Sequence, residues 1–323
     1  MPALSQPADL RLLSKVSKLY YERHLTQQQI AERLHLSRSK VSRLLQQAEQ
    51  QGIVQISIVM PSGGFAHIEN ELEARFGLKE AIVVDVDENA SSAAVVTSLG
   101  AAGAAYLHRM VEDGDVLGIT WGTTLNAMVN ALRPYETRRV HIVQVIGGLG
   151  APEAEIHATD ISSRLAHLLG AKLTLIPAPG IVADLRTKSA LLSDSHVQSA
   201  FGLFPSITMA FVGIGVPEPT SVVMCDGSIM TQAQLDSVLA LGAVGDIGLR
   251  FFDAEGVPVR SALDDLVIGI TLEQLQRIER VIGVAGGLNK APAVYAALRG
   301  RLINVLITDR ALATCLLDRS PDE

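Results

Sequence analysis

The feature that most constrains the fold of this chain is an alternation of short apolar runs with longer helical patterns from residue 81 onwards. Each run has the length and composition of a buried strand, and most of the runs end in glycine. Strands that alternate with helices predict a parallel sheet covered on both faces, which is an α/β fold. The seven runs are AIVVDVD (81–87), GDVLGITWG (114–122), VHIVQVIGGLG (140–150), AKLTLIPAPG (171–180), ITMAFVGIG (207–215), VIGVAGG (281–287) and LINVLITD (302–309).

The segments between these runs read as helices. A further helix is expected around Ile68, Leu72 and Phe76, whose spacing places them on one face. In such a fold, ligands bind beyond the carboxyl ends of the strands, in the crevice near the point where the strand order reverses. The loops that follow the strands are therefore the place to look for a site. The expected helices are 91–112, 123–132, 155–170, 231–242, 271–278 and 291–299.

Length predicts two domains, because one hydrophobic core stops growing at about 250–300 residues and this chain has 323. Apolar residues make up 48% and aromatic residues only 4%, so the core must be largely aliphatic. VQISIV at 54–59 alternates as a strand does, and MPSGG at 60–64 reads as a linker. We therefore expect a first domain over residues 1–59 and a second over residues 60–323.

Several classes of protein are excluded by composition. Two distant cysteines, Cys225 and Cys315, cannot form a disulfide framework or a cysteine-based zinc motif. The N-terminus lacks the pattern of a signal peptide, and no apolar run reaches the roughly 18 residues of a membrane span. The eight histidines show no metal-ligand spacing. We expect a cytoplasmic protein without a metal site, a cofactor or catalytic residues.

The net charge of −7 is divided unequally along the chain. Residues 1–58 hold eight Lys or Arg and four acidic residues, a net charge of +4, which leaves −11 for the rest. A basic head on an acidic body is expected when one module binds phosphates and the other has a different task.

The head predicts three short helices. Apolar residues recur at three- and four-residue spacing over 10–23, which indicates a first helix. Thr26 can cap a second helix, and Gln29 can bond back to it in a capping box. Ser37 can cap a third helix, which Gly52 ends.

The turn between the second and third helices is typical of a helix-turn-helix. Ala31 is small enough for two helices to cross closely, and His35 occupies a position that favours positive φ, which His tolerates. The third helix exposes basic and hydroxyl side chains that can bond phosphates and base edges in the major groove. The alternative is an ordinary helical hairpin with a solvated basic face. The residues expected to contact DNA are Gln27, Gln28, Ser37, Arg38, Ser39, Lys40, Ser42 and Arg43.

Two of four candidate ligand loops are glycine-rich ends of strands. GITWGTTLNAMV places Gly122, Thr123 and Thr124 at a helix start, where free N–H groups and two hydroxyls suit a phosphate. It is not a Walker A loop, because no Lys follows the last glycine. In VIGGLG, Gly147 and Gly148 allow a ligand to approach closely.

The other two loops add charge. GAVGDIGLRFFD places Asp246 between glycines, where a carboxylate could accept bonds from sugar hydroxyls. AGGLNKAPAVYAAL contains Gly286 and Gly287 and brings Lys290 to a helix start as a second cation for a phosphate. Each loop also has a structural alternative. The glycines could serve only as turn residues, Asp246 could cap backbone amides, and Lys290 could be a solvated charge. In the first loop, Trp121 could belong to the core. All four loops are expected at one edge of one sheet, and this convergence favours a ligand site.

Over about residues 10–318 the chain resembles the SorC/DeoR-type sugar-binding bacterial transcriptional regulators. The resemblance rests on the head and on six segments of the body. These are LTQQQIAERLHLSRSKVSRLLQQAEQQGIVQI, GDVLGITWGTTL, IGGLG, IPAP, FVGIG, GAVGDIGLRFFD and GVAGGLNKAPAVYAALRGRLINVLITD.

The resemblance implies an N-terminal helix-turn-helix domain and a Rossmann-like parallel-sheet effector domain related in fold to sugar-phosphate isomerases. It implies homotetramers on operator DNA and effectors that are phosphorylated sugars or polyols. The family's phosphate loop falls on Trp121, Gly122, Thr123 and Thr124, its hydroxyl-binding acid on Asp246 and its lysine on Lys290.

The leading interpretation is a regulator whose operator affinity depends on a phosphorylated sugar or polyol. The alternative is a sugar-phosphate isomerase or deaminase-like enzyme with a DNA-binding appendix. Such an enzyme needs a placed base near the sugar, and we find no second carboxylate or His beside Asp246 in these loops. An architectural DNA-bending protein would leave the large effector domain unexplained.

Overall fold

The computed structural model describes residues 7–54, 64–87, 90–135, 137, 139–148, 158–219 and 229–319. The chain forms two compact units, Met1–Gly64 and Phe65–Glu323. Most of the strand and linker expected at 54–64 lies outside the described residues. Within the described residues, no helix is both long enough and apolar enough to cross a membrane.

The head contains the three predicted helices. The first is divided into α1 (Pro7–Ser17) and a single π-helical turn, η1 (Lys18–Glu22). Helices α2 (Gln27–Leu34) and α3 (Arg38–Gln50) follow. Thr26 and Gln29 form the expected capping box, and the Ser37 hydroxyl accepts from the Lys40 N–H. The three helices enclose a small aliphatic core.

The turn between α2 and α3 has the geometry that the sequence predicted. His35 lies in the left-handed region at φ 54°, and its N–H bonds to carbonyls of the last turn of α2. Ala31 is buried where the two helices meet. A left-handed residue ends α2 abruptly, and Ser37 then starts α3 in a new direction.

The second unit, Phe65–Glu323, contains one seven-stranded parallel sheet, and each of the seven predicted runs contains one of its strands. The order is β1 (Glu80–Val84), β9 (Val305–Asp309), β8 (Arg280–Val284), β5 (Met209–Gly213), β2 (Val116–Ile119), β3 (His141–Gln144) and β4 (Lys172–Thr174). From β2 the chain moves outwards to β3 and β4, and then returns to place β5 on the other side of β2. The strand order therefore reverses between β2 and β5.

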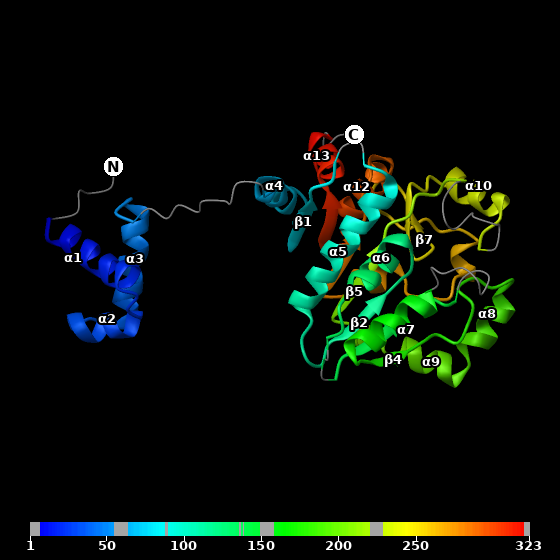
Figure 1. Ribbon diagram of the computed structural model, residues 1–323, viewed down its shortest axis with the longest axis horizontal. Helices are drawn as coiled ribbons and strands as arrows, with labels where there is room; N and C mark the ends of the chain where they lie inside the picture. Colours follow the sequence, from blue (N-terminus) through cyan, green and yellow to red (C-terminus); the bar gives the residue numbers. More distant parts are fainter. Residues whose placement is uncertain are drawn as a thin grey trace. The chain divides into compact units, whose positions relative to one another are not determined.

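Helices cover both faces of the sheet, as the alternation predicted (Figure 1). One face packs against α5 (Ser92–Met110), α6 (Thr123–Ala131) and α7 (Ala158–Leu169), and the other against α4 (Ala66–Phe76), α12 (Ala291–Arg299) and α13 (Arg310–Asp318). The expected helices at 231–242 and 271–278 are α10 (Gln232–Ala240) and the single turn α11 (Leu272–Leu275). Two short helices that we did not predict, α8 (Leu185–Leu192) and α9 (Ser195–Phe201), follow β4.

One predicted loop has a different structure. The segment 242–253 does not follow a strand of the parallel sheet, but forms an antiparallel hairpin of β6 (Gly245–Ile247) and β7 (Arg250–Phe252). Its two turn residues, Gly248 and Leu249, have φ values of 58° and 63°. Positive φ at both central positions is the type I′ geometry that matches the twist of a two-residue hairpin.

The hairpin is fixed in place by a buried cation. The Arg250 guanidinium forms an ion pair with Asp264 at 2.8 Å. It also donates to four backbone carbonyls, those of Asp264, Val267, Gly269 and Ile270. A buried Arg with all its charge compensated holds two chain segments in one geometry.

Helices α5 and α6 approach each other closely because α5 lacks side chains at the contact. A Cβ at Gly100 would lie 2.6 Å from the carbonyl carbon of Ala127, and one at Gly103 would lie 3.0 Å from Met128. This close packing sets the position of α6, whose first residues are the predicted phosphate loop.

We expect Gly100→Ala to destabilise the second unit by about 1–3 kcal/mol, because overpacking outweighs the gain in helix propensity. Urea unfolding followed by circular dichroism measures this. Ala101→Leu is the matched control, since it adds side-chain atoms to an exposed position of the same helix and should change stability little. A Gly100→Ala variant as stable as the parent would contradict the close packing.

Candidate functional site

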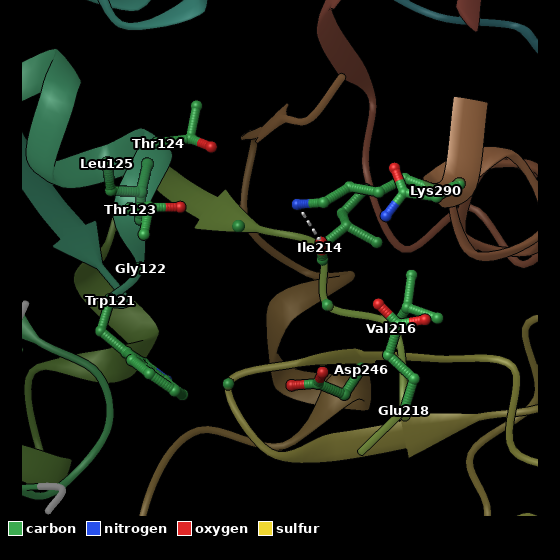
Figure 2. Close-up of a pocket in the computed structure, with 14 residues that line it drawn as sticks. Trp121, Gly122, Thr123, Thr124, Leu125, Ile214, Val216, Glu218, Asp246 and Lys290 are labelled. Atoms are coloured by element: carbon green, nitrogen blue, oxygen red, sulfur yellow. Dashed lines mark hydrogen bonds between the residues drawn. The ribbon is translucent and has the colours of Figure 1, made fainter. Parts of the chain in front are cut away.

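A cavity of about 200 Å³ lies at the carboxyl ends of β2 and β5, where the strand order reverses (Figure 2). This is the crevice in which open α/β sheets bind ligands. Six of the ten predicted effector residues line it: Trp121, Gly122, Thr123, Thr124, Asp246 and Lys290. The other lining residues are Leu125, Gly213, Ile214, Gly215, Val216, Glu218, Gly248 and Asn289.

One wall of the cavity is the start of α6. Gly122 precedes the helix at φ 127°, a conformation that favours glycine, and no side chain caps the first turn. The first N–H groups of a helix have no intrahelical acceptor, so those of Thr123 and Thr124 remain available to a ligand. Figure 2 shows both threonine hydroxyls on the side of the cavity that faces Lys290. This wall combines N–H groups, two hydroxyls and the positive end of a helix dipole.

Lys290 enters the cavity from the turn that precedes α12. Its Nζ donates to the Ile214 carbonyl at 2.9 Å, which fixes the amine at the end of β5. Burial lowers the pKa of Lys290, and the nearby carboxylates of Asp246 and Glu218 partly reverse this effect. The cavity is thus lined by one ammonium group and two carboxylates.

Asp246 lies on β6, and its position depends on an exact fit against Gly215. The two residues exchange both backbone hydrogen bonds, at 2.9 and 3.1 Å. A Cβ at position 215 would lie 2.0 Å from Asp246 Oδ1, so any side chain there would displace the Asp246 carboxylate from its present position. The other oxygen, Oδ2, accepts from the Leu249 N–H at 3.0 Å.

The Asp246 side chain is strongly desolvated. The residue is 5% exposed, and burial raises the pKa of the carboxyl group to about 6, although the Leu249 N–H and the Lys290 charge act in the opposite direction. Perturbed carboxylates in a cavity are typical of functional sites.

Glu218 is a lining residue that the sequence analysis missed. It follows β5 in the segment Val216–Glu218, and its N–H donates to the Val216 carbonyl at 2.9 Å. A second carboxylate therefore lines the cavity together with Asp246, contrary to our expectation of a lone acid. The signal was present, because FVGIG was recognised as a strand ending in glycine, but its following loop was not considered.

Four predicted effector residues do not line the cavity. A Cβ at Gly147 would lie 2.6 Å from the Ala178 carbonyl oxygen, and the Gly148 N–H donates to that same oxygen. A Cβ at Gly286 would lie 2.4 Å from Asp309 Oδ2, which accepts from the Gly287 N–H at 2.6 Å. Close approach of protein segments thus accounts for Gly147 and Gly286, and a φ of 90° accounts for Gly287, whereas position 148 has space for a side chain.

The predicted DNA-binding residues gather at the starts of α2 and α3. Arg38, Ser39, Lys40 and Arg43 are exposed, and Ser37 serves as the cap of α3. Gln28 donates to Glu32 within α2. None of the described head residues forms an ion pair with a basic residue of α3, so these cations are free to meet phosphates.

Comparison with protein families divides the chain in the same way. Residues 61–318 match the family model "Putative sugar-binding domain", and residues 15–51 match the model "Sigma-70, region 4". The second match covers the end of α1, the turn η1 and the helices α2 and α3.

Relatives match over nearly their whole length. The deoxyribonucleoside regulator of Bacillus subtilis is 32% identical over 308 residues, which are 95% of this chain and 97% of the relative. The sorbitol operon regulator of Klebsiella pneumoniae is 32% identical over 315 residues, which are 96% of this chain and 98% of the relative.

A solved structure agrees with both domains. The crystal structure of the full-length sorbitol operon regulator SorC from Klebsiella pneumoniae has a TM-score of 0.74 at 31% identity, and the match covers 98% of this chain and 100% of that one. These relatives are transcriptional regulators and not enzymes, which decides against the isomerase alternative. The chain therefore belongs to the SorC/DeoR family of DNA-binding, sugar-binding transcriptional regulators.

Proposed function

We propose that this regulator responds to a compact sugar or polyol monophosphate, which binds in the cavity between β2 and β5 and changes operator affinity. Residues 1–59 bind DNA, and residues 60–323 bind the effector and form a cytoplasmic homotetramer. The observation that carries the proposal is the charge pattern of the cavity, with an uncapped helix start on one wall and Asp246 and Glu218 on the other.

A phosphate fits the α6 wall. The Thr123 and Thr124 N–H groups and hydroxyls can donate to its oxygens, and Lys290 supplies positive charge from across the cavity. Charge-assisted hydrogen bonds are about twice as strong as neutral ones. The phosphate is therefore expected to contribute most of the affinity.

The remainder of the ligand meets two carboxylates. Asp246 and Glu218 can accept hydrogen bonds from hydroxyl groups, but they repel a second anionic group. This pattern selects a neutral, hydroxyl-rich body with one phosphate. The names of the two relatives refer to a deoxyribonucleoside and to sorbitol, which carry hydroxyl groups, and so support the hydroxyl-bearing body of the proposed ligand.

The effector has to supply only a modest energy. A coupling of about 1–3 kcal/mol changes the affinity for DNA by about 5–150-fold. One helix-turn-helix reads a single half-site, so a symmetric oligomer on a pseudo-palindromic operator gives the required specificity. A tetramer provides two such pairs of heads.

We expect Lys290→Ala to weaken binding of a monophosphate at least tenfold while DNA binding persists. Calorimetry with a panel of aldose and polyol monophosphates, each beside its dephosphorylated form, measures the first effect. Lys172→Ala is the matched control, because Lys172 is an exposed lysine of the same domain outside the cavity. The proposal fails if Lys290→Ala binds as tightly as the parent, or if a dephosphorylated sugar binds better than its phosphate.

The raised pKa of Asp246 has a consequence that can be tested without a ligand. A carboxyl group whose pKa rises on folding stabilises the fold below its unfolded pKa, and this contribution is lost as pH rises through about 6. We expect Asp246→Asn to be more stable than the parent at pH 8, by up to about 3 kcal/mol for two pKa units, and not at pH 4.

Thermal unfolding at pH 4 and pH 8 measures this difference. Asn can still accept from the Leu249 N–H, and Lys290 keeps Glu218 as a counter-charge, so the fold should be preserved. Asp236→Asn, an exposed acid on α10, is the control and should show no such pH dependence. Equal stability of Asp246→Asn and the parent at both pH values would show that the buried carboxylate does not destabilise the fold. Its presence would then need no explanation by ligand binding.

In the head, we expect Arg43→Ala to weaken operator binding by about 1–3 kcal/mol, the range for a lost base contact. The change is on an exposed face of α3, so the protein should remain folded. Gel shifts with a duplex selected from a random pool provide the measurement. Unchanged affinity would show that α3 does not lie in the major groove.

A further inference from the structure

The head carries a second cationic surface, apart from α3. A groove formed by α1, η1 and the last turn of α2 is lined by five basic side chains and one acid. We refer to it as the α1–α2 basic groove. Its basic residues are Arg11, Lys15, Lys18, Arg23 and Arg33, and its acid is Glu22. All six are exposed.

Within the part of the chain that the structure describes, these five cations have no ion-pair partner. Two other acids of the head are engaged elsewhere, since Glu49 accepts from the Tyr21 hydroxyl at 2.6 Å and Glu32 accepts from Gln28 at 2.9 Å. Like charges gathered in one groove repel one another, and the helical packing does not require them.

Their spacing suits a nucleic-acid backbone. Arg11, Lys15 and Lys18 follow one another at four- and three-residue steps and so share one side of the first helix. At a rise of 1.5 Å per residue, the row is about 10 Å long. One DNA strand carries a phosphate about every 3.4 Å along the axis, so the row spans about three nucleotides.

The composition of the groove disfavours a protein partner. Protein interfaces have an apolar or aromatic centre from which charged residues are depleted. Here the apolar lining residues are Leu19, which is 6% exposed, and Leu34, which is half-buried. A ligand in the groove would contact mainly cationic side chains. Such contacts are sufficient to bind phosphates, but they lack the apolar centre of a specific protein interface.

The groove is also distinct from the surface that α3 presents. It does not include Arg38, Lys40 or Arg43, the exposed basic residues of α3. A second hollow near the start of α3, lined by Tyr20, Tyr21 and Arg38, has no lining residue in common with the groove. We propose that the α1–α2 basic groove binds phosphates of the DNA backbone outside the base pairs that α3 contacts. This inference rests on DNA binding by the head.

The test is the salt dependence of DNA binding by the full-length protein. The probes are a duplex selected from a random pool and a scrambled duplex of equal length. Each phosphate contact contributes about −0.9 to the slope of log K against log salt concentration. We expect Lys15→Gln/Lys18→Gln to reduce the magnitude of the slope by about 1.8 for each head bound to the duplex, so that for each bound head its affinity loss between 50 and 200 mM salt is about tenfold smaller than that of the parent.

Sequence preference separates this contact from base recognition. In the Lys15→Gln/Lys18→Gln variant, the ratio of affinities for the selected and scrambled duplexes should stay unchanged, whereas Arg43→Ala should reduce it. Arg133→Gln/Arg277→Gln is the matched control, because it removes two exposed cations from the effector domain and should leave the slope as in the parent. Arg11→Gln/Arg33→Gln is a second groove variant that should behave like the first.

An unchanged slope in both groove variants overturns the inference while leaving DNA binding by α3 intact. A changed oligomeric state with an unchanged slope would assign the groove to a protein contact and overturn it as well. A parent protein that binds neither duplex would refute the proposed function and this inference together.

Discussion

The site depends on the pairing of Gly215 with Asp246. Two backbone hydrogen bonds attach the β6–β7 hairpin to the end of β5, and the absence of a side chain at position 215 lets the carboxylate lie directly against the backbone. Without this attachment the hairpin acid would not reach the crevice between β2 and β5. The buried Arg250 guanidinium holds the other end of the same hairpin, so the acid is fixed from both sides.

A parallel sheet explains why the fold could be predicted from the sequence. Its strands are buried on both faces and therefore form continuous apolar runs, and all seven runs contain strands. The hairpin was not predicted, because its type I′ turn uses Gly248 and Leu249 instead of the Asn-Gly or Asp-Gly pairs that mark such turns. Short strands such as β6 and β7, in addition, carry too little periodicity to be distinguished from a loop.

The candidate site was predicted where local sequence determines geometry and missed where only the tertiary fold does. Gly122, Thr123 and Thr124 lie between a strand and a helix, so their place at the crevice follows from order along the chain. Glu218 joins Asp246 only because an isolated bridge links Gly215, just after β5, to Asp246 on β6. The glycines at 147, 286 and 287 show the opposite limit, since a glycine required by close packing or by a positive φ looks the same in sequence as one required by a ligand.

The two walls of the cavity are positioned by different contacts. A bound ligand that touches both walls would therefore affect the distance between them. The α6 start is positioned by the glycine contact between α5 and α6, whereas Asp246 is positioned by β5 and Arg250. A ligand of the proposed class, with its phosphate on α6 and its hydroxyls on the acids, would span both walls, so it would bind best at a separation that it can bridge. A ligand shifts a conformational equilibrium only through such differential affinity. The desolvated carboxylate strengthens this selection, because hydroxyl donors from the ligand compensate a charge that burial leaves poorly solvated.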